Sequence, residues 1–186
     1  MTDLVPISAL GKRTAYSERI GAIDIKEVQD VAIASVFARR GQDLTAEMKN
    51  LLGARPPIAG QAVLKDDFNA IWMAADQWLV FASEQTHTDL VSEIKETLRD
   101  RVSITEQSDA WFCLDVAGDS VVDLCERLCA VPVRRMSEGG ATRTTVHQMG
   151  CFIACIEAGQ KMRFFAPRSS AGSFLHAVTT AAHSVA

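Results

Sequence analysis

The same order of predicted elements occurs twice along this chain of 186 residues, and this repetition limits the possible folds more than any other feature. Each half contains, in order, a predicted strand, a helix, three strands and a second helix. Asp30 and Asp109 open matching strands 79 residues apart, and residues 78–81 of the first half correspond to residues 162–165 of the second. Internal similarity of this kind indicates two units of one architecture packed together.

The strands and helices are predicted from apolar periodicity and from the turn residues between them. In the first half, strands are expected at 23–25, 30–38, 62–64, 69–73 and 78–82, with helices from Asp43 to Gly53 and over 86–99. In the second half, strands are expected at 110–116, 141–147, 151–157 and 161–166, with helices after Gly118 and over 169–182.

Neither half alternates strand and helix strictly, as a doubly wound parallel sheet would require. We therefore expect an α+β fold in which each half is an antiparallel or mixed sheet covered by helices, in the manner of a ferredoxin-like unit. The expected division is an N-terminal arm at 1–20, a first half at 21–101 and a second half at 102–186.

The charge balance argues against nucleic acid and membranes as partners. The formal net charge is −4, with 23% charged and 48% apolar residues, as in an ordinary globular protein. No apolar run approaches the roughly 18 residues of a membrane-spanning helix, and no signal-peptide pattern opens the chain. Five cysteines, an odd number, favour free thiols in a reducing compartment. We expect a cytoplasmic protein.

Four of the cysteines form two pairs of equal spacing, which raises the question of a zinc site. Cys125 and Cys129 lie one turn apart on a predicted helix and could chelate a metal. Cys151 and Cys155 lie on a predicted strand, where four residues span roughly 13 Å. Two sulfurs that far apart cannot both lie about 2.3 Å from one zinc ion. We expect small buried side chains and no metal.

No set of residues predicts catalysis. His147 and Cys151 stand too far apart on the predicted strand to act as a base and its nucleophile. The other histidines, His87, His176 and His183, are expected at the surface or its boundary. Glycine-rich phosphate loops and a nucleophile elbow are both missing from the sequence. The expected catalytic set is therefore empty.

Two features could hold an anion or contact a partner. One is Arg143, a charged residue among β-branched neighbours on the predicted strand 141–147. The other is Arg168 beside Ser169, at the start of the last predicted helix, because a helix N-terminus next to an arginine can hold a carboxylate or phosphate. The simpler alternative is a surface arginine next to a helix that is capped by Ser169 or Ser170.

Three segments of the second half resemble a known family. The aromatic strand Ser108-Asp109-Ala110-Trp111-Phe112-Cys113-Leu114-Asp115-Val116-Ala117-Gly118 comes first. Ala141-Thr142-Arg143-Thr144 follows, and Phe164-Phe165-Ala166-Pro167-Arg168-Ser169 leads into the final helix. In this order they resemble the gamma subunit of heterotetrameric sarcosine oxidase, and the strand at Trp78-Leu79 fits the same pattern. The resemblance covers the chain from about residue 20.

This resemblance implies a role as well as a fold. The gamma subunit is similar to a fragment of the folate-binding fold of glycine-cleavage aminomethyltransferases, and it is regarded as structural. Its alpha, beta and delta partners carry the chemistry: the beta subunit holds the flavins, FAD and FMN, and the alpha subunit binds NAD and tetrahydrofolate. Together they convert sarcosine to glycine, hydrogen peroxide and methylene-tetrahydrofolate. The resemblance therefore implies a non-catalytic subunit that binds no cofactor itself.

Two other functions stay open. The chain could be a free-standing folate-binding or aminomethyl-transferring protein. It could also be a regulatory module of two ferredoxin-like halves that binds a small effector.

Overall fold

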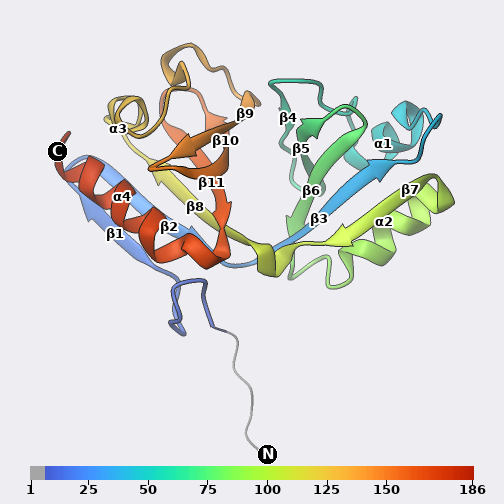
Figure 1. The fold of residues 1–186 in the computed structure, drawn as a ribbon, viewed down its shortest axis with the longest axis horizontal. Coiled ribbons are helices and arrows are strands. Elements are labelled where there is room, and N and C mark those ends of the chain that lie inside the picture. Colours follow the sequence, from blue (N-terminus) through green and yellow to red (C-terminus); the bar gives the residue numbers. More distant parts are fainter. Residues whose placement is uncertain (1–6) are drawn as a thin grey trace, which may run out of the picture. The chain divides into compact units, whose positions relative to one another are not determined.

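The computed structural model describes residues 7–186 (Figure 1). Of the predicted arm at 1–20, residues 1–6 lie outside the described residues, and the strand β1 (Ser17–Ile20) forms the end of the arm. No helix in the described part of the chain is long and apolar enough to cross a membrane.

The described chain forms two compact units. Unit 1 contains residues up to Gln29, Asp109–Glu138 and Arg143–Ala186, and unit 2 contains Asp30–Ser108 and Gly139–Thr142. Unit 2 is thus inserted within the sequence of unit 1. These units differ from the predicted ranges 21–101 and 102–186, because the strand β2 (Ile23–Val28) pairs with a strand that begins after residue 110.

Unit 2 contains a five-stranded antiparallel sheet in the order β4-β5-β6-β3-β7. The strands are β3 (Val31–Ala38), β4 (Ala62–Val63), β5 (Asn69–Ala74), β6 (Gln77–Ser83) and β7 (Val102–Glu106). The helices α1 (Thr45–Leu52) and α2 (Leu90–Leu98) cover one face of the sheet and share its apolar core.

The helix α2 shows how the sequence sets the local structure of unit 2. The Asp89 carboxylate accepts a hydrogen bond from the Ser92 backbone N–H at 3.1 Å, which caps the first turn. Leu90, Ile94 and Leu98 recur every four residues and are buried. Predicted over 86–99, the helix starts only after this cap, and it ends where Arg99 adopts φ 54°.

Unit 1 contains a six-stranded sheet in the order β1-β2-β8-β11-β10-β9. Its remaining strands are β8 (Trp111–Ala117), β9 (Ala141–Val146), β10 (Met149–Glu157) and β11 (Lys161–Pro167). The four pairs from β1 to β10 are antiparallel. The helices α3 (Val121–Leu128) and α4 (Ala171–His183) bury their apolar side chains in the same core as one face of this sheet.

The predicted repeat and the α+β class are confirmed by the strand order. The order β3-β6-β5-β4 in unit 2 matches β8-β11-β10-β9 in unit 1, with a helix after the first strand and another after the last hairpin. Each first strand has one more antiparallel neighbour, which is β7 for β3 and β2 for β8. In the sequence, β2 directly precedes β3, the first strand of unit 2, and β7 directly precedes β8, the first of the four matched strands of unit 1.

One close approach holds the extra strands of unit 1 in place. Gly118, which follows β8, adopts φ 124°, and a Cβ atom added there would lie 1.9 Å from the Ala22 carbonyl oxygen in the turn between β1 and β2. The end of the chain reaches the same turn, because Ala186 lies against Gly21. Only glycine combines that φ with backbone contact this tight.

Candidate functional site

The three residues predicted for an anion site all lie in unit 1, with Arg143 on one element and Arg168 and Ser169 on another. Arg143 is exposed on β9, and its guanidinium reaches over Gly150, where an added Cβ atom would lie 3.8 Å from Nη2. Arg168 and Ser169 belong to the single 3₁₀ turn η4 (Arg168–Ser170) before α4. Their role in anion binding or partner contact stays a prediction.

Arg168 holds the start of the described chain. Its Nη2 donates a hydrogen bond to the Ile7 carbonyl oxygen at 3.1 Å, and its Nη1 lies 3.6 Å from the Asp109 carboxylate. A buried carboxylate fastens the same segment, since Glu27 accepts hydrogen bonds from the backbone N–H groups of Ala9 and Tyr16 at 3.1 and 2.9 Å. Arg168 thus has protein partners already.

The predicted serine cap of the last helix is wrong. The helix begins at Ala171, not at Ser169, and the hydroxyl of its N-cap residue, Ser170, makes no capping hydrogen bond. Ser169 is exposed within the 3₁₀ turn. The 3₁₀ turn stands between Pro167, the last residue of β11, and the first residue of the helix.

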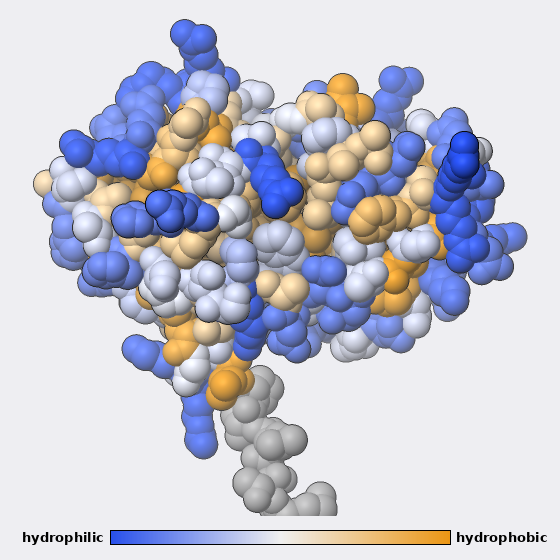
Figure 2. All heavy atoms as spheres, viewed as in Figure 1, coloured by the Kyte–Doolittle hydropathy of each residue, from blue (hydrophilic) through white to orange (hydrophobic). Residues whose placement is uncertain are grey.

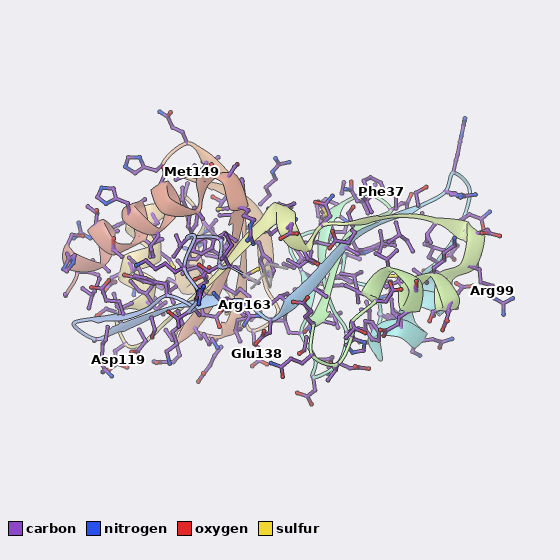
Figure 3. The ribbon with its side chains drawn as sticks, turned by 90° about the horizontal axis from the view of Figure 1, so that it is seen from below. Phe37, Arg99, Asp119, Glu138, Met149 and Arg163 are labelled. Carbon is purple, nitrogen blue, oxygen red and sulfur yellow. The ribbon has the colours of Figure 1, made fainter. Side chains whose placement is uncertain are left out.

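The strongest polar cluster is one that the sequence analysis missed. Asp115 on β8 is paired with Arg163 on β11 through Nε at 2.6 Å and Nη2 at 2.9 Å, and Lys161 Nζ lies 2.9 Å from the same carboxylate. The Asp115 side chain is only 10% exposed and that of Arg163 19%. Figure 3 shows Arg163 among the strands of unit 1. The register Arg163↔Asp115 places the two residues directly opposite each other.

The charges of this cluster satisfy one another. Burial by itself raises the pKa of Asp115, but the hydrogen bonds and positive charges of Arg163 and Lys161 outweigh it and hold that pKa below its usual value. Burial raises the pKa of the neighbouring Cys113 thiol to about 12, although Arg163 opposes the shift. Both oxygens of Asp115 are occupied by cations, so the cluster is built to stabilise the sheet and not to take up a proton.

The five cysteines are free thiols. The prediction that they are buried is confirmed for four of them and is wrong for Cys129, which is half-buried. Burial raises the pKa of Cys151 to about 12 and that of Cys125 further. A thiol held this far from its thiolate form is a poor nucleophile at neutral pH. Within residues 7–186, no group of His, Cys, Asp or Glu side chains is arranged to hold a metal ion.

His87 in unit 2 is more deeply placed than predicted. His87 is 8% exposed, and its ring centroid lies 4.4 Å from that of Phe68. A carboxylate lies beside each of its ring nitrogens. Nε2 lies 2.6 Å from Asp67 and Nδ1 lies 2.5 Å from Glu93. Burial lowers the pKa of His87, but the two carboxylates raise it more, so the net shift is upward. The predicted surface positions of His176 and His183 are confirmed.

A basic depression lies on unit 2 between α2 and β7. Its volume is about 330 Å³, and it is open to solvent. Three of its side chains are cationic and one is anionic. Its lining residues are Arg39, Val91, Lys95, Arg99, Asp100, Val102, Ser103 and Ile104. Figure 3 shows the Arg99 side chain pointing outward from unit 2.

One buried donor has no partner in the described part of the chain. The indole Nε1 of Trp111, at the start of β8, is enclosed and makes no hydrogen bond. The ring packs edge-on against Phe152 with 5.7 Å between centroids. Of the aromatic strands that the sequence analysis singled out, β8 and β11 add Phe112 and Phe164 to the apolar core of unit 1, and β6 adds Trp78 to the core of unit 2.

Comparison with solved structures places this chain among proteins of one fold. Its fold matches a chain of the heterotetrameric sarcosine oxidase from Corynebacterium sp. U-96, solved in complex with pyrrole 2-carboxylate, with a TM-score of 0.79 and 16% identity. The match covers 90% of this chain and 87% of that chain. No family model matches the sequence, and a comparison with curated proteins finds no match.

Two further solved structures share the fold. One is the glycine cleavage system aminomethyltransferase T from Bartonella henselae, with a TM-score of 0.62 and 10% identity over 84% of this chain. This chain spans only 45% of that protein. The other is the regulatory subunit of aspartate kinase from Thermus thermophilus, with a TM-score of 0.50 and 16% identity over 84% of this chain. The expected likeness to a fragment of an aminomethyltransferase is confirmed at the level of fold.

Proposed function

We propose that this chain is the non-catalytic gamma-type subunit of a heterotetrameric sarcosine oxidase. The observation that carries the proposal is the match over nearly the full length of both chains to a chain of the Corynebacterium enzyme. A full aminomethyltransferase is much longer, since this chain spans 45% of the one it resembles. The fold therefore agrees with a single subunit of the sarcosine oxidase type better than with a complete transferase.

The side chains of the described residues support a structural role. Asp115 is bound to two cations, His87 lies between two carboxylates, and the buried thiols are protonated. A catalytic acid, base or nucleophile needs an atom free to meet a substrate. In the complex we propose, FAD, FMN, NAD and tetrahydrofolate are held by alpha, beta and delta partners, which demethylate sarcosine to glycine.

The surface agrees with a protein that associates through selected places. Figure 2 shows small apolar areas separated by hydrophilic side chains on one face. Within residues 7–186, the large apolar side chains that are exposed are Ile7, Phe37 and Ile58. Ile7 lies at the start of the described segment that Arg168 holds, and this segment is a suitable place for a partner chain to bind.

Co-purification tests the proposal. The chain is expressed with its genomic neighbours, and the complex is separated by size. We expect it to elute with flavin-containing chains in a fixed ratio and to lack flavin when it is expressed alone. Elution as a free chain in the presence of those neighbours contradicts the proposal.

The aminomethyltransferase-like fold supports one alternative, a free-standing folate-binding protein. That alternative requires the isolated chain to bind tetrahydrofolate, which a calorimetric titration measures directly. Saturable binding by the isolated chain favours the alternative, and no heat of binding removes it.

A further inference from the structure

The strand β7 has an open outer edge. In the five-stranded sheet of unit 2 it is terminal, and its inner side pairs with β3. Among the described residues, no strand pairs with its outer side. An unpaired row of backbone N–H and C=O groups is a template for another extended chain.

The hydrogen-bond pattern shows which backbone groups point outward. Arg39 N donates to Arg101 O at 2.8 Å, and Gln107 N donates to Ile33 O at 2.8 Å. Since bonded positions alternate along an antiparallel pair, 103 and 105 also bond to β3. The backbone groups of Val102, Ile104 and Glu106 therefore face the open side.

The basic depression borders this edge. Val102, Ser103 and Ile104 line both features, and Val91 adds apolar surface from α2. Three cationic side chains of the depression are exposed and can contact a bound segment, namely those of Arg39, Lys95 and Arg99. Asp100 is the single acidic lining residue. The site thus offers a few apolar side chains, an open strand edge and net positive charge.

Backbone strain at the rim points the same way. Arg99 is not glycine, yet it adopts φ 54° and ψ −143°. It is both the C-cap residue of α2 and the first residue of the turn η1 (Arg99–Arg101). Such a conformation costs on the order of 1–3 kcal/mol and is concentrated at functional positions. Here it turns the Arg99 side chain out of the helix path at the end of the depression.

We propose that the open edge of β7 and the basic depression bind an extended, carboxylate-bearing segment of a partner polypeptide, which adds a strand to the sheet of unit 2. The inference deepens the proposed function and rests on it in one respect, namely that the partner is another chain of the complex. Main-chain hydrogen bonds to 102, 104 and 106 supply binding energy. Carboxylates at alternate positions of the segment meet Arg39, Lys95 and Arg99.

A second copy of this chain is a less suitable occupant. Pairing of β7 with β7 of another copy brings together two depressions that carry the same three cations. Like charges that face each other across an interface oppose association. An acidic segment avoids this repulsion, because its charge complements that of the depression.

Synthetic peptides test the site on the full-length chain. The probes are labelled peptides of about seven residues, a common strand length, that alternate Val with Glu, or Val with Lys in the control. We expect saturable binding of the Glu peptide only, weakening as salt is raised from about 0.05 to 0.5 M. Equal binding of both peptides, or of neither, overturns the proposal, and a salt-dependent dimer of the chain itself identifies self-pairing in its place.

Two substitutions locate the binding. Ile104→Pro removes an outward N–H while the bonds between β7 and β3 remain, and we expect about a tenfold loss of Glu-peptide affinity. Ile104→Ala loses comparable packing but keeps the N–H, so it should bind the peptide within about twofold of the original chain. Equal losses in the two variants contradict edge pairing.

Charge reversal completes the test. Lys95→Glu should weaken binding about fivefold, while Lys49→Glu on the exposed surface of α1 should leave it unchanged. In the co-purified complex, Ile104→Pro should lower the fraction of this chain that is bound. A complex that forms fully with Ile104→Pro refutes this inference and leaves the proposed function intact, whereas no complex even with the original chain refutes the proposed function.

Discussion

The sheets of the two units share four strands in one order and differ at the edge beyond the first of them. In unit 1 the extra strand β2 is covered by β1, and in unit 2 the extra strand β7 is terminal, with no strand beyond it in the described part of the chain. The cover in unit 1 is secured by the contact of Gly118 with Ala22 and by the Glu27 hydrogen bonds to the preceding segment. One architecture therefore ends on an added strand, β1, in unit 1 and on β7 itself in unit 2, and among the described residues both terminal strands are unpaired on their outer sides.

The end of the sheet is expected to contribute to stability in unit 1 and to association with a partner in unit 2. In unit 1 the terminal strand needs extra chain, namely the segment that leads into β1. An open edge next to cations leaves a surface for a chosen partner. The largest stability effects are accordingly expected in unit 1, near β8, and the smallest in unit 2.

The substitution Gly118→Ala should have the largest effect. Its Cβ would lie 1.9 Å from the Ala22 oxygen at φ 124°, so β8 and the β1–β2 turn must separate. We expect a loss of about 4 kcal/mol from the free energy of unfolding, combining backbone strain with overpacking. Urea titration followed by circular dichroism measures it. The control is Gly172→Ala in α4, which has open space around it and should stabilise by up to about 1 kcal/mol.

The substitution Asp115→Ala should rank second. It leaves Arg163 and Lys161 without their shared carboxylate, and we expect a loss of about 3 kcal/mol, as for other broken buried ion pairs. The matched control is Asp123→Ala, which breaks an exposed pair with Arg134 and should cost less than about 1 kcal/mol. Similar losses for the two variants would show that burial contributes nothing to the Asp115 cluster.

The substitution Glu27→Gln should loosen the segment before β1. The amide keeps one carbonyl oxygen, so it can serve only one of the N–H groups of Ala9 and Tyr16, at a cost of about 1 kcal/mol. The expected result is faster trypsin cleavage after Lys12 and Arg13, both of which are exposed. Unchanged cleavage there, with cleavage elsewhere also unchanged, contradicts the anchoring role of Glu27.

The pH dependence of unit 2 should show the smallest effect. Because the pKa of His87 is raised in the folded chain, its ion pairs contribute fully below the ordinary value of 6.5 and are lost as pH rises through the raised value. His87→Gln should remove a stabilisation of up to about 1 kcal/mol at pH below 6.5 and change little in alkaline solution. Melting temperatures across this range measure it, and a variant with the original pH profile would contradict the assignment.

The sequence by itself determined the repeated order of elements and the α+β class. The strands at 161–166 and 110–116 were predicted because each segment is rich in apolar residues, and the structure confirms them as β11 and β8. The spacing of the cysteines, which does not suit a zinc site, led to the prediction that they are buried, and four of the five are. These features depend on neighbours along the chain, where local rules apply.

Only the tertiary structure decided which strands pair and which charges meet. The strands β1 and β7 were not predicted, because SERI and VSITE are short and half polar and become strands only beside β2 and β3. Asp115 and Arg163 are 48 positions apart, and no local pattern joins them. The available signal was the presence of charged residues within two apolar strands, one in β8 and two in β11. The insertion of unit 2 within unit 1 gives β2 to one sheet and β7 to the other, and only the strand order shows that β7 is terminal while β2 is followed by β1.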